Sequence, residues 1–276
     1  MAVVQTSKWL DAYMAKKDKE TSKIKVRKHH QEQISGRLKP YFHHANTVEI
    51  HEHLLRNGLF LPSPDDKSII KSLKEKNCWE TVKTSLTKLR KDWHGPDVPV
   101  FILPSNVQNR KLQADFNGLS GLSYPDKVFL FVTPYNKKVE LEKLLIHEYN
   151  HVCRLKHLDK SEANMDLLDS IVLEGLAEMA VEERLGKEHL AKWATLYPSK
   201  TALYHWEKWL QPNCTVKRAE RRHYELLYGK GFIPRWAGYN TGYHMVSSYV
   251  ANTNSTIEQM LDVPAETILK ESDFPK

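Results

Sequence analysis

The sequence predicts a mostly helical α+β protein in which a small sheet comes directly before one functional helix. Helical hydrophobic periodicity runs through most of the chain before residue 95 and returns from Asn136 onward. Between them lie two short apolar runs, VPVFILP (98–104) and KVFLFVT (127–133), rich in Val, Ile and Phe and bounded by turn residues. This order of helices, a few strands and further helices is typical of the α+β class.

The N-terminal part is expected to be helical in two stretches. Residues 6–57 show helical patterns with polar faces, and residues 64–93 keep a helical apolar period after the Ser63-Pro64 start signal. The turn-forming residues 94–97 (His-Gly-Pro-Asp) mark a boundary. We therefore expect an N-terminal helical region, 1–95, and a second region, 96–276, or one continuous domain containing both.

Composition is that of a globular protein. The 276 residues are 41% hydrophobic and 27% charged, and no stretch reaches the roughly 20 apolar residues of a membrane span. The first ten residues already contain a charged side chain, and the N-terminus has no apolar core before a small-residue cleavage site, as a secretory signal would. Cys78, Cys153 and Cys214 form no C-x-x-C pair, so reduced thiols are expected. These features predict a cytoplasmic location.

The net charge of 41 − 34 = +7 is spread along the chain. In the densest basic run, residues 16–30, the acidic residues Asp18 and Glu20 interrupt the positive charge. A solvated helix face explains this run better than a nucleic-acid surface, so no nucleic acid partner is expected. The balance weakly favours acidic substrates.

The segment LEKLLIHEYNHVCRLKH, residues 141–157, contains H-E-x-x-H. On a helix, His147 and His151 lie one turn apart on one side and can bind one metal ion. Glu148 lies beside them and can take a proton from a water molecule at the open metal position. Residues 51–55 begin with the same His-Glu pair, but Leu55 occupies the position of the second histidine. We therefore interpret His51 and His53 as packing or surface residues.

A catalytic zinc ion normally has three protein ligands. In the helical stretch expected at 161–185, Glu174 and Glu178 lie four residues apart on an otherwise apolar face. Buried carboxylates are unfavourable unless they are paired or bind metal. We predict Glu174 as the third zinc ligand and Glu178 as the acceptor of a hydrogen bond from the far nitrogen of a ligand histidine. The alternative is an ordinary acidic helix face.

His157 is a rival third ligand. It has the spacing seen in metzincins, but Arg154 stands where those proteins have the glycine that turns the chain back to the metal. If the helix continues, His157 lies about 15 Å from His147 along the axis. We therefore expect His157 near the helix end, away from the metal.

An aromatic tract, residues 235–252, contains Tyr239 and Tyr243 on one helical face. A phenol can donate a hydrogen bond to the oxyanion formed during amide hydrolysis. Tyr243 is the first candidate for this role and Tyr239 the second, and a packed aromatic helix is the alternative. Gly238 and Gly242 would let another backbone or a substrate approach closely.

HEYNH followed by LEGLAE resembles the gluzincin metallopeptidases, in which a second helix supplies a glutamate ligand. More closely, residues 95–270 resemble the YjaZ-like family of predicted zinc-dependent proteases. That resemblance implies a zincin-like metallopeptidase domain with Zn²⁺ as cofactor and a peptide or protein as substrate. Twenty-two residues separate His151 from Glu174, a few more than is usual in gluzincins.

The sequence therefore predicts a zinc metallopeptidase that uses zinc-activated water and Glu148 as general base. The first alternative is a non-catalytic zinc-binding or regulatory interaction protein. An intact Glu148 argues against it, because a structural zinc site needs no base. The second alternative is a basic nucleic-acid-binding protein in which the motif occurs by accident.

Overall fold

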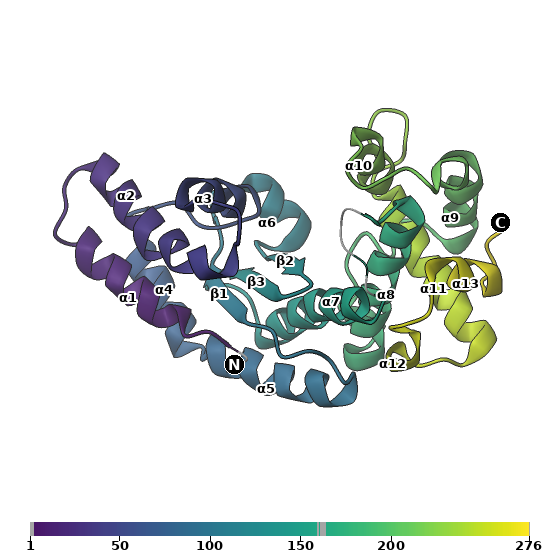
Figure 1. Cartoon of the computed structure of the whole chain (residues 1–276), viewed down its shortest axis with the longest axis horizontal. Helices are drawn as coiled ribbons and strands as arrows, with labels where there is room; N and C mark the ends of the chain where they lie inside the picture. The colour runs from purple at the N-terminus through teal and green to yellow at the C-terminus, as the bar shows by residue number, and fades with distance from the viewer. Residues whose placement is uncertain (1–2, 159, 161–163, 276) are drawn as a thin grey trace. The chain divides into compact units, whose positions relative to one another are not determined.

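A computed structural model describes residues 3–158, 160 and 164–275 of the chain. It is mostly helical and contains one three-stranded sheet, which confirms the predicted α+β class (Figure 1). Two compact units are present. Unit 1 comprises Met1–Lys91 and Asp97–Leu145, and unit 2 comprises Asp92–Pro96 and Ile146–Lys276.

Unit 1 contains both helical stretches expected before residue 95. The expected stretch 64–93 consists of two helices, because Asn77 between them adopts a left-handed conformation with φ of 52°. The helical elements are α1 (Thr6–Lys17), α2 (Lys23–Gln33), a 3-10 helix (Ser35–Tyr41), α3 (Thr47–Arg56), α4 (Asp66–Glu75), α5 (Cys78–Asp92) and α6 (Arg110–Phe116).

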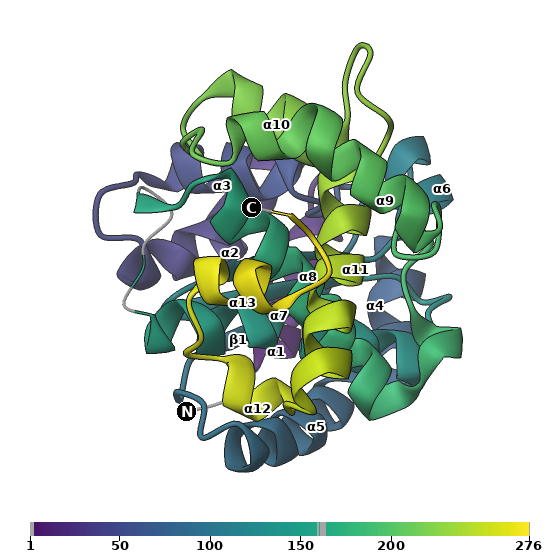
Figure 2. The same cartoon turned by 90° about the vertical axis from the view of Figure 1, so that its right-hand side faces the viewer.

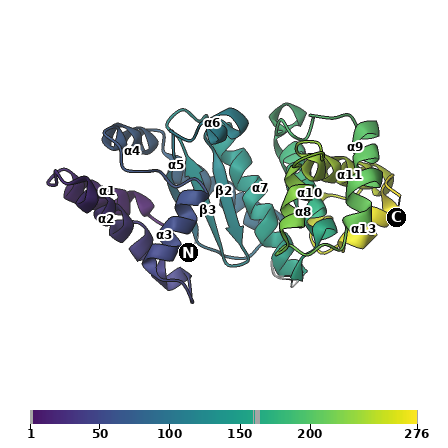
Figure 3. The same cartoon turned by 90° about the horizontal axis from the view of Figure 1, so that it is seen from above.

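The sheet of unit 1 has the order β1-β3-β2, with β1 (Val100–Pro104), β2 (Ser120–Tyr124) and β3 (Lys127–Val132). The two strands expected from the apolar runs are β1 and β3. They pair in parallel, with Phe101 opposite Phe129. The strand β2 was not expected; it pairs with β3 in antiparallel orientation and is only half-buried. Figure 3 shows the sheet together with the helices of this unit.

The core of unit 1 forms where helices cover one face of this sheet. Leu10 and Tyr13 of α1 and Ile50 and Leu54 of α3 are buried together with alternate residues of β1 and β3. Those strand residues are Phe101, Leu103, Phe129 and Phe131. Because every residue of β1 and β3 is buried, these strands lack the polar alternation of a half-exposed sheet.

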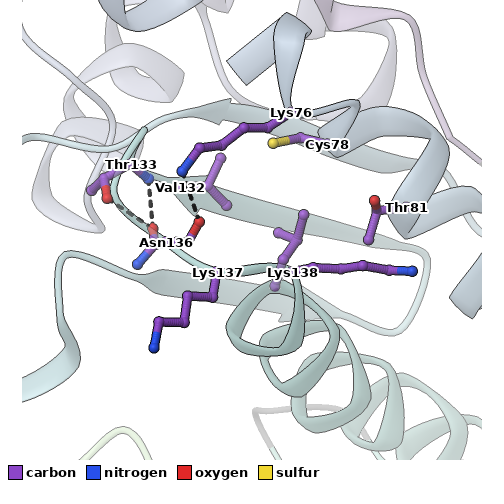
Figure 4. A pocket seen from close by; sticks show the side chains of 9 residues that line it. Lys76, Cys78, Thr81, Val132, Thr133, Asn136, Lys137 and Lys138 are labelled. Atoms are coloured by element: carbon purple, nitrogen blue, oxygen red, sulfur yellow. Dashed lines mark hydrogen bonds between the residues drawn. The ribbon is translucent and has the colours of Figure 1, made fainter. Parts of the chain in front are cut away.

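A small pocket of about 240 Å³ opens where β3 ends and α7 (Lys138–His157) begins (Figure 4). Apolar side chains and lysine stems line it, and the Lys76 ammonium group reaches across to the carbonyl oxygens of Pro134 and Asn136. The pocket contains none of the residues predicted from the motif.

Unit 2 is built from helices that bury most of α8 (Leu167–Leu185). Residues 161–163 of the helix expected at 161–185 lie outside the described residues. Asp166 begins α8, and a capping box joins it to Asp169. The remaining helices, seen face-on in Figure 2, are α9 (Ser199–His205), a π-helix (Trp206–Leu210), α10 (Arg221–Tyr228), α11 (Ala237–Thr253), α12 (Ile257–Met260) and α13 (Ala265–Glu271).

The closest helix crossing in the described part of unit 2 joins α8 to α11. A Cβ atom added to Gly175 would lie 2.1 Å from the carbonyl oxygen of Gly242, and one added to Gly242 would lie 2.1 Å from the carbonyl oxygen of Ile171. One added to Gly238 would lie 2.8 Å from the Cα of Leu227 in α10. The close backbone approach expected at Gly238 and Gly242 is therefore present.

The boundary between the compact units falls inside α7, between Leu145 and Ile146. The sheet is grouped with the N-terminal helices because its buried phenylalanines share their core. The expected division into 1–95 and 96–276 places the sheet with the second region, and as a statement about domains it stays a prediction. Within the described residues, no helix is both long and apolar enough to span a membrane.

Candidate metal centre

The helix that carries H-E-x-x-H runs without interruption from Lys138 to His157. Arg154 lies within it and is almost completely buried, and its guanidinium donates a hydrogen bond of 2.9 Å to the carbonyl oxygen of Met260. Burial lowers the pKa of Arg154 to about 10. Because this arginine is held in the helix and no turn forms there, His157 lies exposed at the helix end. The metzincin-like alternative is therefore not supported.

The two histidines of α7 meet a glutamate from α8. The side-chain ligand atoms of His147, His151 and Glu174 all lie within 4.8 Å of one another. The Oε2 atom of Glu174 is 3.2 Å from Nε2 of His147 and 3.6 Å from Nε2 of His151. The imidazole rings lie 4.7 Å apart at 79° to each other. The structure thus brings together the three side chains predicted as zinc ligands.

This geometry fits a zinc ion. Zinc bound at about 2.0–2.1 Å by tetrahedral ligands separates them by about 3.3 Å, which is close to the two measured distances. Two imidazole nitrogens and one carboxylate oxygen form a common donor set for catalytic zinc. In addition, Nδ1 of His151 is buried and has no hydrogen-bond partner among the described residues. The facing ligand atoms of the three side chains therefore contact one another and have the spacing that one ion requires.

Glu178 lies one helical turn beyond Glu174 and contacts the other nitrogen of His147. Its Oε2 atom is 3.4 Å from His147 Nδ1, and its side chain is almost completely buried. Its second oxygen accepts a hydrogen bond from the backbone N–H of Ala191. A proton on Nδ1 directed to Glu178 leaves Nε2 of His147 free to bind metal. The sequence predicted a contact of this kind for Glu178, and its role beside a metal ion stays a prediction.

The pKa values of these three side chains are shifted in different directions. Burial lowers the pKa of His147, but hydrogen bonds to Glu174 and Glu178 outweigh this effect and raise it to about 10. Burial lowers the pKa of His151 to about 3. Burial would raise the pKa of Glu174, yet the neighbouring histidines hold it below its usual value. The carboxylate therefore stays charged, as metal binding requires.

Glu148 follows His147 on α7, and its side chain is buried with 9% exposure. Its negative charge is one of the influences that raise the pKa of His147, so its carboxylate lies near the cluster. A carboxylate next to the ligands but outside the set of three can exchange protons without leaving the metal under-coordinated.

Tyr239 interacts with Glu174 of the ligand cluster. Burial and the carboxylate of Glu174 raise its pKa well above the usual value, so its hydroxyl keeps its proton. That hydroxyl donates a hydrogen bond of 2.9 Å to the hydroxyl of Tyr228, a residue of α10. Burial and Glu174 also raise the pKa of Tyr228, to about 12. Sequence reasoning missed Tyr228, because nothing in its local pattern links it to the motif.

Tyr243, the first candidate from the sequence, lies one turn further along α11. Its hydroxyl donates a hydrogen bond of 2.7 Å to Oε2 of Glu182. Burial and this bond raise its pKa. The geometry therefore favours Tyr239 over Tyr243 as a donor beside Glu174, which reverses the order expected from sequence.

Trp193 also lies at the centre, although the sequence suggested only a core role. It is buried, and its ring contacts His147 at 6.4 Å and Tyr239 at 5.0 Å between ring centroids. An apolar wall beside metal ligands excludes water and strengthens electrostatic interactions. Periodicity could not reveal this role, because a buried tryptophan in a core gives the same signal.

The fold and the centre define a class of helical α+β protein with a two-histidine, one-glutamate cluster shared by two helices. The chain belongs to the family described as a predicted Zn-dependent protease, whose model matches residues 78–270. This confirms the resemblance to the YjaZ-like family.

Two relatives come from Bacillus subtilis (strain 168). The chain is 38% identical to the protein YjaZ over 217 residues, which cover 79% of this chain and 83% of YjaZ. It is 26% identical to the protein YjfC over 176 residues, covering 61% of this chain and 58% of YjfC. No solved structure matches the chain.

Proposed function

We propose that this protein is a zinc-dependent metallopeptidase that hydrolyses peptide bonds. The observation that carries the proposal is the cluster of His147, His151 and Glu174, with ligand atoms within 4.8 Å of one another. Membership of a family described as a predicted Zn-dependent protease supports the same reaction class.

In this proposal His147, His151 and Glu174 hold the zinc ion. When bound, zinc supplies Lewis acidity, which polarises a carbonyl group and lowers the pKa of a water molecule. Glu178 fixes the imidazole of His147 through Nδ1, so that Nε2 keeps its direction. Trp193 and the buried helix faces keep bulk water away from these side chains.

Glu148 is the general base and then the general acid. Its carboxylate accepts a proton from the attacking water and passes that proton to the amine nitrogen that leaves. Its position supports this role, because the side chain is buried next to the predicted ligands without being one of them.

Tyr239 is the proposed donor to the negative charge that develops on the carbonyl oxygen. Its raised pKa keeps the O–H group intact, and the hydroxyl, which donates to Tyr228, would have to release that residue to act. Tyr243 remains a second candidate and would have to release Glu182 to act.

The experiment that tests this function combines metal analysis with an assay. Purified protein should carry about one zinc ion per chain and should hydrolyse an unstructured polypeptide, and both properties should disappear with a chelator and return with added zinc. Zinc without hydrolysis would favour the non-catalytic zinc-binding or regulatory alternative. Absence of zinc binding would contradict the proposal.

A further inference from the structure

We propose that residues 217–235, here called the basic strip, bind an acidic stretch of the polypeptide substrate beside the metal centre. This inference rests on the proposed function and names the substrate class. The strip comprises α10 and the turns before and after it.

The strip concentrates positive charge. It contains six basic residues and two acidic ones, a balance of +4 within 19 residues. Residues 16–30 carry +5 within 15 residues, but they belong to unit 1, whereas the strip belongs to the unit that contains the predicted metal ligands. The basic residues are Lys217, Arg218, Arg221, Arg222, Lys230 and Arg235, and the acidic residues are Glu220 and Glu225. Such a concentration attracts oppositely charged segments and raises their association rate.

Several of these charges are exposed to solvent. The side chain of Arg221 is 90% exposed and that of Arg222 is 45% exposed, and both approach the single carboxylate of Glu225, at 2.8 and 3.7 Å. Two guanidinium groups that share one carboxylate leave an uncompensated positive charge. A substrate carboxylate can supply the missing partner.

The strip is attached firmly to the helices of the metal centre. His223 of α10 is buried, and its Nε2 atom lies 2.9 Å from the hydroxyl of Ser170 on α8. Gly238 lets α11 pack directly against Leu227 of α10. A substrate held on the strip is therefore held at a fixed place relative to Glu174.

The contact with the reacting centre is made by Tyr228, the last residue of α10. Its hydroxyl accepts a hydrogen bond of 2.9 Å from Tyr239 of α11. Through this hydrogen bond the end of α10 contacts α11, the helix that carries the candidate tyrosines.

The loop that ends the strip adds apolar contact area. Phe232 is 95% exposed, and the loop between α10 and α11 projects from the helices (Figure 2). The ring of Tyr224 is 41% exposed, with the Lys230 ammonium group 4.4 Å from its centroid. Exposed rings beside cations suit a polypeptide that carries apolar and aromatic side chains as well as carboxylates.

The test measures binding without turnover. Full-length Glu148→Gln protein loaded with zinc is titrated into fluorescein-labelled poly(Glu,Tyr), with poly(Lys,Tyr) as the oppositely charged probe. Poly(Glu,Tyr) should bind more tightly, and the double change Arg221→Glu with Lys230→Glu should weaken its binding about tenfold or more. The neutral pair Arg221→Gln with Lys230→Gln should give an intermediate loss.

The matched control carries the same charge change on exposed residues of α5, Lys83→Glu with Lys88→Glu, and should bind like the parent. Equal binding by the strip variant and this control would overturn the inference. So would tighter binding of single-stranded poly(U) than of poly(Glu,Tyr), because the strip would then be a nucleic-acid surface.

The assay of wild-type protein separates the two proposals. Cleavage of poly(Glu,Tyr) that is slowed in the strip variant through a higher KM, with little change in kcat, supports both. Strip-dependent binding with no cleavage by wild-type protein would remove the proposed function and leave the docking surface. Cleavage that ignores both substrate charge and the strip would overturn only the docking surface.

Discussion

Gly175 and Gly242 meet where α8 crosses α11, and a Cβ atom on Gly175 would lie 2.1 Å from the carbonyl oxygen of Gly242. On α8, Gly175 follows Glu174, and on α11, Gly242 precedes Tyr243. This contact sets the distance between the helix that supplies a predicted zinc ligand and the helix that supplies the candidate tyrosines. Two glycines are needed because any side chain at this point would separate the two backbones.

Gly175→Ala and Gly242→Ala are therefore expected to destabilise unit 2. Overpacking at a rigid backbone contact costs about 1–3 kcal/mol or more, and here the neighbouring atoms are backbone that cannot rotate away. Chemical denaturation would measure the change in unfolding free energy. Gly36→Ala is the control, since its Cβ would meet atoms at 3.8 and 3.9 Å, an ordinary contact distance. Equal effects of all three changes would contradict this explanation.

The fold class, the motif helix and Glu174 as the candidate third ligand could be predicted from the sequence, because each leaves a local signal. His147 and His151 have the helical spacing, and Glu174 interrupts an apolar face on its own helix. Arg154 in place of glycine correctly indicated that the helix continues. These are consequences of periodicity, which depends only on nearby residues.

The sequence could not predict which side chains meet between helices. Tyr239 and Tyr243 share a helix face, and only the crossing with α8 places one beside Glu174 and the other beside Glu182. Tyr228 reaches the centre because α10 packs on α11, which no local pattern encodes. The strand β2, with two serines and a glycine, has too few apolar residues for a clear alternation.

The second prediction concerns the third ligand. Glu174→Ala should lower zinc affinity at least tenfold, because it removes a charged donor whose carboxylate oxygen lies 3.2 Å from His147 Nε2. His157→Ala should leave the affinity unchanged, because His157 is exposed at the end of α7. Competition with a zinc-binding dye measures both. A loss of affinity in His157→Ala that matched the loss in Glu174→Ala would overturn the assignment.

The third prediction compares the two tyrosines. Tyr239→Phe should lower kcat by about 10²–10³, the usual effect of removing one donor to an oxyanion. Tyr243→Phe should lower it less than about tenfold, because its hydroxyl bonds to Glu182, whereas Tyr239 interacts with Glu174 of the ligand cluster. Zinc content should be unchanged in both proteins, so that the difference reflects the chemical step. The opposite order of defects would restore Tyr243 as the donor.

The fourth prediction concerns acid stability of unit 1. His30 is completely buried, both ring nitrogens lack hydrogen-bond partners among the described residues, and the rings of Tyr13, Phe60 and His51 surround it. Burial, with the charges of His51 and Lys17, lowers its pKa from 6.5 to about 3. The unfolded chain therefore binds a proton below about pH 6.5 that the folded chain binds only near pH 3.

It follows that stability should fall as the pH is lowered from 6.5 toward 3, with a contribution of up to about 1.4 kcal/mol per pH unit from this residue. His30→Leu should remove that contribution while keeping an apolar side chain of similar size in the core. Urea denaturation between pH 7 and 4.5 measures the difference in slope between the two proteins. Parallel slopes would show that His30 is not the titrating group.

The fifth prediction separates chemistry from metal binding. Glu148→Gln should keep zinc, because Glu148 is outside the cluster of His147, His151 and Glu174. The amide has nearly the shape of the carboxylate, so the folded state should lose little stability even though the side chain is buried. It cannot accept the proton from water, and hydrolysis should fall by about 10²–10⁴. Metal content, thermal stability and kcat are to be measured on the same preparation.

If the structural-zinc alternative were correct, the substitution would leave every functional property of the protein intact. Hydrolysis by Glu148→Gln at the wild-type rate, in protein free of contaminating peptidase, would exclude Glu148 as the base even with zinc fully bound.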